Sequence, residues 1–513
     1  MKFKKHRFSS FLRLVLVALM VVLQVILVAL LVDTLRKSAL YIYIIIEIAA
    51  LIEILVLISQ NRNSEYTIGW IVVIALLPVF GQILYFLWGR PVSRRSKGSM
   101  QLADSIEYGK KALLDDSKAF SALSAAYPMR KRIGGYLKSK GYPVYENTDV
   151  RYFKIGEDQF EQMLFDIENA QRFVFLEYFI VSEGKLWDRF EELLKKKAAQ
   201  GVEVRLMYDD FGSILTLGDG FMRRLEASGI KVVRFNPIHK YISRLYINYR
   251  NHQKICVIDG QIGYTGGTNL ADEYANYYPK HGHWKDVAIR LEGDAVLSLT
   301  VNFLEMWDGS LNTRSNYDDY KAADKYKGET QGFIQPFADG PLSGDDNPAE
   351  LVYRTIISNA QRYVYITTPY LVISTSMMDT LIAAAESGVD VRIITPKIWD
   401  HWYVHAVTRS NYAPLLKAGV RIYEYTPGYI HAKTIISDDE HAVTGSINMD
   451  YRSFNLHYEN GVWLCGSPVL SNILSDITET FQKSEEIKLF EHMKRPFYIR
   501  FIENTLRIFA IFM

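Results

Sequence analysis

Two stretches of the chain share one pattern of polar residues: "NHQKICVIDGQIGYTGGTN" at residues 251–269 and "IHAKTIISDDEHAVTGSIN" at residues 430–448. In each stretch a lysine follows the histidine by two positions, an aspartate by seven and an asparagine by seventeen. A single His-x-Lys would mean little, whereas four residues at the same spacing twice are not a coincidence. The pattern indicates that the chain holds two copies of one folded unit.

The similarity between the copies extends well beyond these stretches. "QRFVFLEYFIVSEG", from Gln171, matches "QRYVYITTPYLVIST", from Gln361, and in both copies an amphipathic helical pattern and a further strand follow. Gly201 and Gly388 stand where these helices must end, directly before "VEVRLM" and "VDVRII". Strands that alternate with helices are typical of α/β folds. We therefore predict a duplicated α/β fold with two mixed-sheet halves related by a pseudo-twofold axis, preceded by transmembrane helices.

This organisation divides the chain into four predicted segments. The connector between the halves is expected near "ADGPLSGDDNP", residues 338–348, because Gly, Pro and Asp favour turns. The segments are a membrane anchor at 1–97, a polar linker at 98–130, a first half at 131–337 and a second half at 338–513 with an amphipathic tail. The tail, "RPFYIRFIENTLRIFAIFM", fits either a packed terminal helix or an element at a membrane surface.

Three apolar runs predict membrane-spanning helices at about 11–33, 39–59 and 68–89. The second run carries Glu47 and Glu53, which either face neighbouring helices or form a proton or ligand site. The third contains the helix breakers Pro78 and Gly81, which membrane helices tolerate. Basic residues on the two sides nearly balance, so it is the cluster "GRPVSRRSK" that favours a cytoplasmic catalytic region.

Each histidine of the repeated pattern shares a strand face with its lysine, because residues i and i+2 of a strand project to the same side. If the halves pack about a twofold axis, both pairs meet in one cleft that suits an anion, above all a tetrahedral phosphate. The small residues of "TGGTN" and "TGSIN" are expected to leave backbone amides exposed to that anion. The predicted phosphate-binding residues are Gly267, Asn269, Ser446 and Asn448.

The aspartates of the pattern, Asp259 and Asp438, follow apolar strand residues and precede a reversal of the chain. Asp-Gly at 259–260 is a strong hairpin signal, so turn geometry alone accounts for an aspartate there. As members of the repeated pattern they are also counted as candidate catalytic residues, together with His252, Lys254, His431 and Lys433.

Two histidines are sufficient for phosphodiester transfer without a metal. One, neutral, attacks phosphorus and forms a phosphohistidine, while the other, protonated, donates a proton to the leaving oxygen and then activates the incoming hydroxyl. Each ring needs an acceptor on its second nitrogen, which fixes the tautomer. Asp286 and Glu459 lie at equivalent places downstream of His252 and His431 and are the predicted orienting acceptors.

No metal and no cofactor are expected. Cys256 and Cys465 lie in apolar, strand-like runs without the spacing of a metal site or a disulfide framework. "HGH" at 281–283 is more typical of a loop than of a metal site, and "DDFG" at 209–212 has no accompanying kinase signature. A net charge of +2 argues against binding nucleic acid through a basic surface.

The repeated pattern resembles the signature of the phospholipase D superfamily, in which His-x-Lys is followed by Asp and then by Gly-Gly or Gly-Ser two positions before Asn. "GSINMDYRSFNLHYENG" looks like the second motif of that family, with Asp450, Arg452, Ser453 and Glu459 in place. Over nearly the whole chain the sequence is similar to the bacterial cardiolipin synthases, with "FLEYFIV", "YDDFGS", "GGTNLADEY" and "TTPYL" at the expected places. Members of that family often have two spans, so a third is a departure.

This resemblance implies transfer of a phosphatidyl group from one phosphatidylglycerol to the hydroxyl of another, with release of glycerol. His252 would carry the phosphatidyl group and His431 would act as acid and base, although the residues themselves leave the opposite assignment open. The expected partners are phosphatidylglycerol and anionic membrane lipids, at a bacterial cell membrane crossed several times. The alternatives are a phospholipase D-type hydrolase, a transferase with another alcohol acceptor, a nuclease and a catalytically silent scaffold.

Overall fold

The computed structural model describes residues 22–23, 26, 37–60, 64–89, 96–113, 118–237, 248–328, 330–343 and 347–510. They belong to two compact units, an N-terminal unit that ends at Pro91 and a main unit that runs from Val92 to the end of the chain. The first predicted span, at about 11–33, lies outside the described residues except for three isolated positions.

In the N-terminal unit, the second predicted span corresponds to helix α2 (Lys37–Ser59). Its segment Leu40–Ser59 has a mean hydropathy of 2.6 and is, among the described residues, the one helix long and apolar enough to cross a membrane. Its side chains are mostly exposed along the whole length, as lipid-facing side chains would be.

The third predicted span is interrupted. The structure has a shorter apolar helix α3 (Ser64–Leu76), then α4 (Phe80–Leu84) and a π-helical turn at Tyr85–Gly89. Pro78 lies in the break, where it has no backbone N–H to continue the hydrogen-bond ladder. Gly81 lies so close to α3 that a Cβ there would be 2.5 Å from the carbonyl oxygen of Val73. The third predicted span, at about 68–89, is therefore a broken helix in the structure.

The described residues of the predicted polar linker at 98–130 are largely helical, with α5 (Lys97–Ala112) and α6 (Lys118–Ala126), and α7 (Lys131–Ser139) follows. Leu102 and Ile106 of α5 are buried, and Leu102 packs directly on Gly309 of α12 (Val296–Leu311). The apolar positions of the linker recur at helical spacing, which gives α5 one face to bury.

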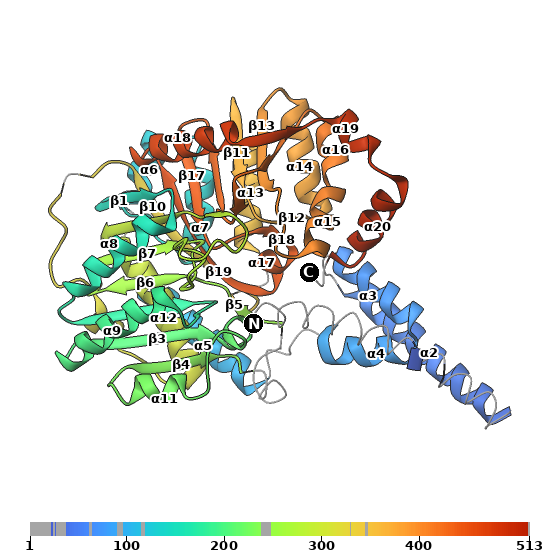
Figure 1. The fold of residues 1–513 in the computed structure, drawn as a ribbon, viewed down its shortest axis with the longest axis horizontal. Helices are drawn as coiled ribbons and strands as arrows, with labels where there is room; N and C mark the ends of the chain where they lie inside the picture. The colour runs from blue at the N-terminus through green and yellow to red at the C-terminus, as the bar shows by residue number, and fades with distance from the viewer. Residues whose placement is uncertain are drawn as a thin grey trace. The chain divides into compact units, whose positions relative to one another are not determined.

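The main unit contains two large sheets with the same order of strands, except that the second sheet has one more strand at its end (Figure 1). The first runs β1 (Thr148–Phe153), β9 (Ala288–Gly293), β7 (Ile262–Gly266), β6 (Ile255–Ile258), β2 (Phe173–Tyr178), β3 (Glu203–Asp209), β4 (Lys231–Phe235). The second runs β10 (Phe333–Asp339), β19 (His457–Cys465), β17 (His441–Gly445), β16 (Thr434–Ser437), β11 (Tyr363–Thr367), β13 (Asp390–Pro396), β14 (Arg421–Tyr425), β20 (Ser484–Ile487). Strands β2, β3 and β4, like β11, β13 and β14, are parallel, and the others are antiparallel. The predicted duplicated mixed-sheet fold is confirmed.

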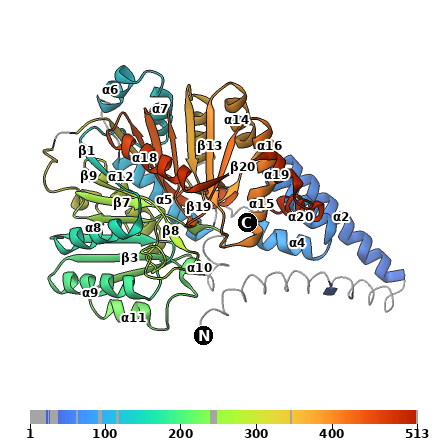
Figure 2. The same cartoon turned by 45° about the horizontal axis from the view of Figure 1, so that its top comes forward.

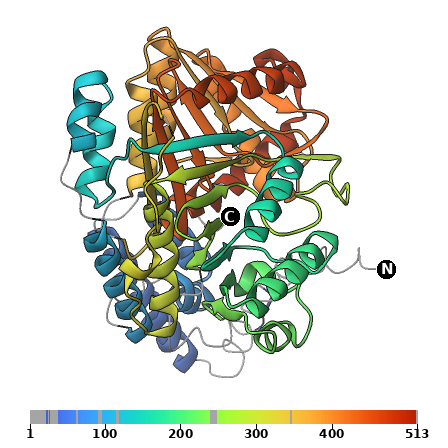
Figure 3. The same ribbon diagram turned by 90° about the vertical axis from the view of Figure 1, so that its left-hand side faces the viewer.

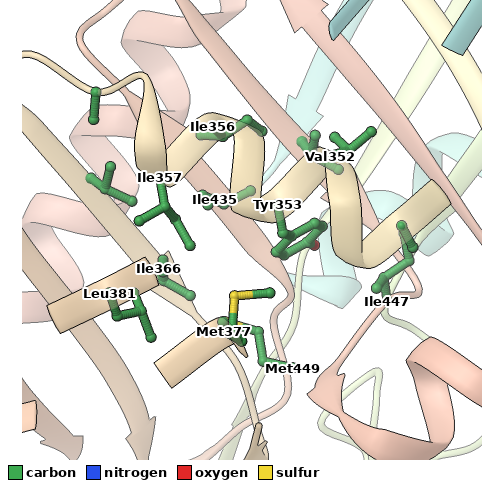
Figure 4. Close-up of a cluster of buried hydrophobic side chains, with 14 of the residues drawn as sticks. Val352, Tyr353, Ile356, Ile357, Ile366, Met377, Leu381, Ile435, Ile447 and Met449 are labelled. Carbon is green, nitrogen blue, oxygen red and sulfur yellow. The ribbon is translucent and has the colours of Figure 1, made fainter. Parts of the chain in front are cut away.

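Helices cover the faces of both sheets, and the two halves lie side by side in all three ribbon views (Figures 1, 2 and 3). The helices of the first half include α8 (Gly156–Glu168), α9 (Lys185–Ala199), α11 (Phe221–Glu226) and α12. Those of the second half include α13 (Pro348–Ser358), α14 (Thr375–Glu386), α16 (Tyr412–Lys417) and α18 (Val469–Gln482). Val352, Tyr353 and Ile356 of α13 pack with Ile366 and Ile435 of the second sheet (Figure 4).

The motif aspartates stabilise the turns of two hairpins. Asp259 and Asp438 have φ of 54° and 59°, in the left-handed region, and follow β6 and β16. The Asp438 carboxylate accepts three backbone N–H groups, from residues 361–363, at 2.8 to 3.1 Å, and the guanidinium of Arg130 at 2.9 Å. Asp259 accepts the amides of residues 171–173 in the same way. They lie at the strand ends away from the motif histidines, so their place among the catalytic candidates is corrected to a structural one.

This role predicts that Asp438→Ala weakens the fold without removing the chemistry. The change leaves three amides and the buried Arg130 without their acceptor, so we expect a loss of about 3 kcal/mol in the free energy of unfolding. Thermal unfolding of the full chain in detergent measures it. The neighbouring Asp439→Ala breaks a half-exposed ion pair with Arg362 and should cost less than about 1 kcal/mol. Loss of turnover by Asp438→Ala with an unchanged melting temperature would contradict this role.

Candidate active site

Two short ladders exchange strands between the halves. Strand β5 (Arg250–Asn251), which leads into His252, pairs in parallel with β19 of the second sheet. Strand β15 (Gly428–Ile430), which leads into His431, pairs in parallel with β8 (His283–Lys285) of the first half. The ladders continue into the histidines, because the His252 amide donates to the Tyr458 carbonyl at 2.9 Å and the His431 amide to the Lys285 carbonyl at 2.7 Å.

The exchange places each histidine beside the carboxylate of the other half. His252 Nδ1 lies 2.8 and 3.0 Å from the two carboxylate oxygens of Glu459, and His431 Nδ1 lies 2.6 Å from Asp286 Oδ2. In the sequence, each acid follows the histidine of its own copy. In the structure, it lies at hydrogen-bond distance from the histidine of the other copy. Each ring can therefore donate its Nδ1–H to a carboxylate, which leaves the Nε2 lone pair free.

Both carboxylates are fully buried and held by further donors. Glu459 accepts the hydroxyl of Ser453 at 2.7 Å and that of Ser446, and Asp286 accepts the backbone amide of Val287 at 2.8 Å. Such bonds fix the direction of the carboxylate and, through it, the plane of the imidazole.

Aromatic side chains lie beside the two imidazoles, and the side chains of His252 and His431 each keep 8% of their surface accessible. Phe179 lies 5.0 Å from the His252 ring centre, and Tyr274, Trp284 and Tyr429 lie 5.4 to 6.0 Å from that of His431. Burial, reinforced by Lys433, lowers the pKa of His431 to about 4 against the opposing effect of Asp286. Burial and the two motif lysines hold the pKa of His252 well below its usual value. Without a bound anion these shifts favour the neutral form of both rings near pH 7, whereas a phosphate bound beside them would favour a protonated ring.

The two lysines of the pattern are buried close to the histidines. Lys254 Nζ donates to the carbonyl of His252, and Lys433 Nζ donates to the carbonyl of His431 and lies 2.9 Å from its Nδ1. Burial lowers the pKa of Lys254 to about 7 and that of Lys433 to about 8, although Glu459 and Asp286 oppose this shift. A nearby anion would favour the charged ammonium groups, so the cluster is suited to bind one.

Two of the residues predicted to bind phosphate use their backbone amides for hydrogen bonds within the protein. The amide of Gly267 donates to the Val287 carbonyl at 3.0 Å and that of Ser446 to the Asn460 carbonyl at 2.9 Å, so the expectation that these amides face an anion is wrong. Both are strand-end amides that complete the β7–β9 and β17–β19 ladders.

The side chains of the two asparagines differ. Asn269 accepts the amide of Ile180 at 3.0 Å and donates to the Tyr274 hydroxyl at 2.8 Å, which ties the loop after β7 to the loop after β2. Asn448 is buried, and its Oδ1 has no hydrogen-bond partner among the described residues. The side chain hydrogen-bonds Asp450, and an unpaired carbonyl oxygen can only accept a hydrogen bond, so contact between Asn448 and a bound phosphate stays a prediction.

His457 is a site residue that the sequence analysis missed. Its ring lies 5.3 Å from that of His252, its Nδ1 is 3.6 Å from Glu459 Oε1, and its Nε2 accepts from Arg452 Nε at 3.1 Å. Alternation along β19 is the signal that could have found it, because residues 457 and 459 point to the same face. His252, His457 and Glu459 offer ligand atoms within 4.8 Å of one another, a spacing that could also hold a metal ion.

The comparison with protein families identifies this arrangement. The model described as "Cardiolipin synthase, PLD-like domain" matches twice, over residues 163–306 and 353–484, and each match contains one histidine and one carboxylate of the crossed pairs. The chain belongs to the cardiolipin synthase family of phospholipase D-like proteins. A second model, described as "Phospholipase_D-nuclease N-terminal", matches residues 39–90, which cover α2 to the π-helical turn.

Individual relatives of this family agree over most of the chain. Cardiolipin synthase 1 of Bacillus anthracis is 34% identical over 89% of this chain and 90% of its own length. The major cardiolipin synthase of Bacillus subtilis is 34% identical over 90% of this chain and 96% of its own length. The crystal structure of a phosphatidylserine synthase from Haemophilus influenzae covers 75% of this chain and 100% of its own, with a TM-score of 0.58 and 15% identity, and thus shares the fold.

The contact between Gly267 and Asp286 predicts a severe effect of Gly267→Ala. A Cβ at 267 would lie 2.1 Å from Asp286 Oδ1, so the carboxylate must move away from His431. We expect turnover to fall about 100-fold, as for other losses of a histidine-orienting carboxylate. The equivalent position of the second half already carries a Cβ, and Ser446→Ala removes one hydroxyl only, so it should cost about tenfold or less. Turnover rates of the purified full-length variants measure the difference. Equal losses of turnover in Gly267→Ala and Ser446→Ala would contradict this prediction.

Proposed function

We propose that the protein is a cardiolipin synthase, which transfers a phosphatidyl group from one phosphatidylglycerol to the free primary hydroxyl of another and releases glycerol. The observation that carries the proposal is the agreement with cardiolipin synthases over about 90% of the chain, with both motif histidines oriented in one cluster. No part of the reaction requires an oxidant or a nucleotide, because one phosphodiester bond is exchanged for another.

In the first step, the neutral His252 attacks with Nε2. Its Nδ1–H bond to Glu459 directs the lone pair outward and stabilises the positive charge that develops on the ring. A bond from Nε2 to phosphorus forms as the bond from phosphorus to the glycerol oxygen breaks. His431 donates a proton to that oxygen, and glycerol leaves as a neutral alcohol.

In the second step, His431 acts as a base instead of an acid. His431, now neutral, takes the proton from the hydroxyl of a second phosphatidylglycerol, whose oxygen attacks phosphorus while the bond to His252 breaks. The products are cardiolipin and free His252, and His431 regains its proton. Water in place of the lipid hydroxyl would give phosphatidic acid, which is the outcome of a hydrolase.

The two histidines differ in a way that supports this division of roles. Burial lowers the pKa of both histidines; Asp286 opposes this shift at His431, whereas Lys254, Lys433, His431 and Arg452 add to it at His252. His431 therefore holds a proton more readily, as a general acid must, and a phosphate anion would raise its proton affinity further. Lys254 and Lys433 would neutralise the non-bridging oxygens, and Asn448 would donate a hydrogen bond to them.

We also propose that α2 anchors the enzyme in a bacterial cell membrane that the chain crosses more than once, with the main unit on the cytoplasmic side. Support comes from the apolar length of α2, from the family match over residues 39–90 and from the basic cluster "GRPVSRRSK" that precedes the main unit. Phosphatidylglycerol would then be both a membrane component and the substrate.

Product analysis tests the proposed function. Purified full-length protein in mixed micelles with phosphatidylglycerol should yield cardiolipin and glycerol in equal amounts by mass spectrometry, without added metal or nucleotide. His252→Ala should yield neither, with a loss of at least about 10⁴-fold, because no other nucleophile replaces the ring. Phosphatidic acid without cardiolipin would instead assign the protein as a hydrolase.

A substrate with a better leaving group separates the roles of the histidines. In His431→Ala the loss of general acid catalysis should slow the reaction with phosphatidylglycerol by about 10³-fold. With phosphatidyl-4-nitrophenol the phenolate leaves without a proton, so this variant should release a rapid burst of one nitrophenol per enzyme. His252→Ala should show no burst. A burst in His252→Ala and none in His431→Ala would reverse the assignment.

A further inference from the structure

The terminal helix α20 (Phe497–Arg507) turns its apolar side away from the protein. Phe497, Tyr498, Phe501 and Ile502 are 74%, 65%, 60% and 48% exposed, and Ile508 continues the same stripe at 44%. These positions recur at helical spacing and thus form one face. Water-exposed stripes of this kind are rare on soluble proteins and mark a surface that contacts another apolar phase.

The side of α20 that faces the protein is anchored by charge as well as by packing. Glu503 is 5% exposed and accepts two hydrogen bonds from the guanidinium of Arg495, at 2.6 and 2.9 Å. Leu506 and Ala510 pack against Val404 and Val407, two residues of α15 (Trp402–Ser410). A rotation of α20 that buried the phenylalanines would expose Leu506 and break the Arg495–Glu503 pair, so the outward orientation is stabilised.

Two tryptophans continue the exposed surface toward the candidate active site. Trp402, the first residue of α15, and Trp399, three residues before it, are 46% and 47% exposed. Asp400, between them, accepts a hydrogen bond from the Tyr370 hydroxyl, and Tyr370 packs on the same apolar cluster as Leu506. Tyr429, whose ring stacks on His431, lies close enough to Tyr370 to influence the pKa of its hydroxyl. A continuous set of contacts thus leads from this surface to the His431 ring.

Basic side chains flank the apolar stripe. Lys494 Nζ lies 4.0 Å from the ring centre of Phe490, which is 70% exposed, and Arg500 and Arg507 lie on α20 beside the stripe. An apolar face bordered by Lys and Arg, with tryptophans at its edge, is the composition of helices that lie in the interface of an anionic bilayer. The same basic residues would repel the equivalent surface of a second copy of the protein.

We propose that the C-terminal patch, formed by the α20 stripe with Phe490, Trp399 and Trp402, docks the main unit onto a bilayer that contains anionic phospholipid. The phenylalanines enter the boundary between headgroups and acyl chains, and the basic residues contact phosphates. Docking places the side of the main unit on which Tyr370 and Tyr429 link the patch to the His431 ring against the lipid. This inference extends the proposed function, because it names the surface through which the lipid substrate is supplied.

Depth measurement on the full chain tests the docking without any catalytic readout. Cys256 and Cys465 are fully buried, so a thiol-reactive fluorophore labels an introduced cysteine selectively. Phe501→Cys reports on the patch, and Gln200→Cys, directly after α9, is the reference, because α9 and α20 lie on opposite sides of the main unit in Figures 1 and 2. In vesicles with phosphatidylglycerol, iodide should quench label 501 about fivefold less than label 200, and lipid-borne nitroxide should quench only label 501. Equal quenching by iodide overturns the proposal.

A pair of variants tests what the docking does for catalysis. Phe497→Glu with Phe501→Glu should lower cardiolipin formation on vesicles about tenfold while turnover in detergent micelles stays unchanged, because only the vesicle requires docking. Phe497→Leu with Phe501→Leu keeps the apolar face and should retain both activities. If neither the wild-type protein nor any variant makes cardiolipin in micelles, the proposed function is wrong. The quenching experiment does not depend on activity and tests the docking separately. If the glutamate pair instead converts a detergent-solubilised dimer into a monomer, the patch is a contact between copies and the docking proposal is wrong.

Discussion

The crossed pairing of histidines and carboxylates is the interaction on which the site depends. Among the residues that the structure describes, neither His252 nor His431 has an orienting carboxylate within its own half, because Glu459 lies on β19 and Asp286 follows β8. The backbone ladders β5–β19 and β15–β8 bring the two elements of each pair to hydrogen-bond distance. A small change in the packing of the halves would therefore misalign both rings at once, and interior packing resists such a change.

Several buried polar contacts secure the packing of the halves near this cluster. Lys285, one residue before Asp286, donates to both carboxylate oxygens of Asp476 on α18 at 2.8 Å. Asn460, one residue after Glu459, donates to the Thr265 hydroxyl at 2.7 Å. Each contact joins opposite halves and sits next to an orienting carboxylate. Buried charge pairs add little net stability, but their strict geometry fixes the register of the elements that carry them.

The sequence predicted the duplication, the mixed α/β sheets and the set of histidines, lysines and carboxylates that gather at the site. These predictions rest on local periodicity and on spacing along the chain, which a repeated pattern displays directly. The crossing could not be predicted, because it depends on how the halves pack. The same limit explains why Asp259 and Asp438 were counted with the chemistry, since a residue seven positions from a histidine lies at the far end of its strand.

Other differences have equally local causes. The amides of Gly267 and Ser446 were expected to be open because the residues are small, but both positions end a sheet ladder that uses them. At Gly267 the missing Cβ leaves room for Asp286 rather than for a ligand. The break near Pro78 shows that an apolar run of sufficient length need not form one helix when proline and glycine stand three residues apart.

The exchanged ladders also bear on the origin of the chain. A primordial protein with a single repeat would have had a histidine in one molecule and the acid that orients it in another, so it could have worked only as a homodimer. Gene duplication and fusion would then have joined the two subunits covalently and released each repeat to diverge. The serine at 446 opposite the glycine at 267, and the additional His457, are differences of the kind that such divergence permits.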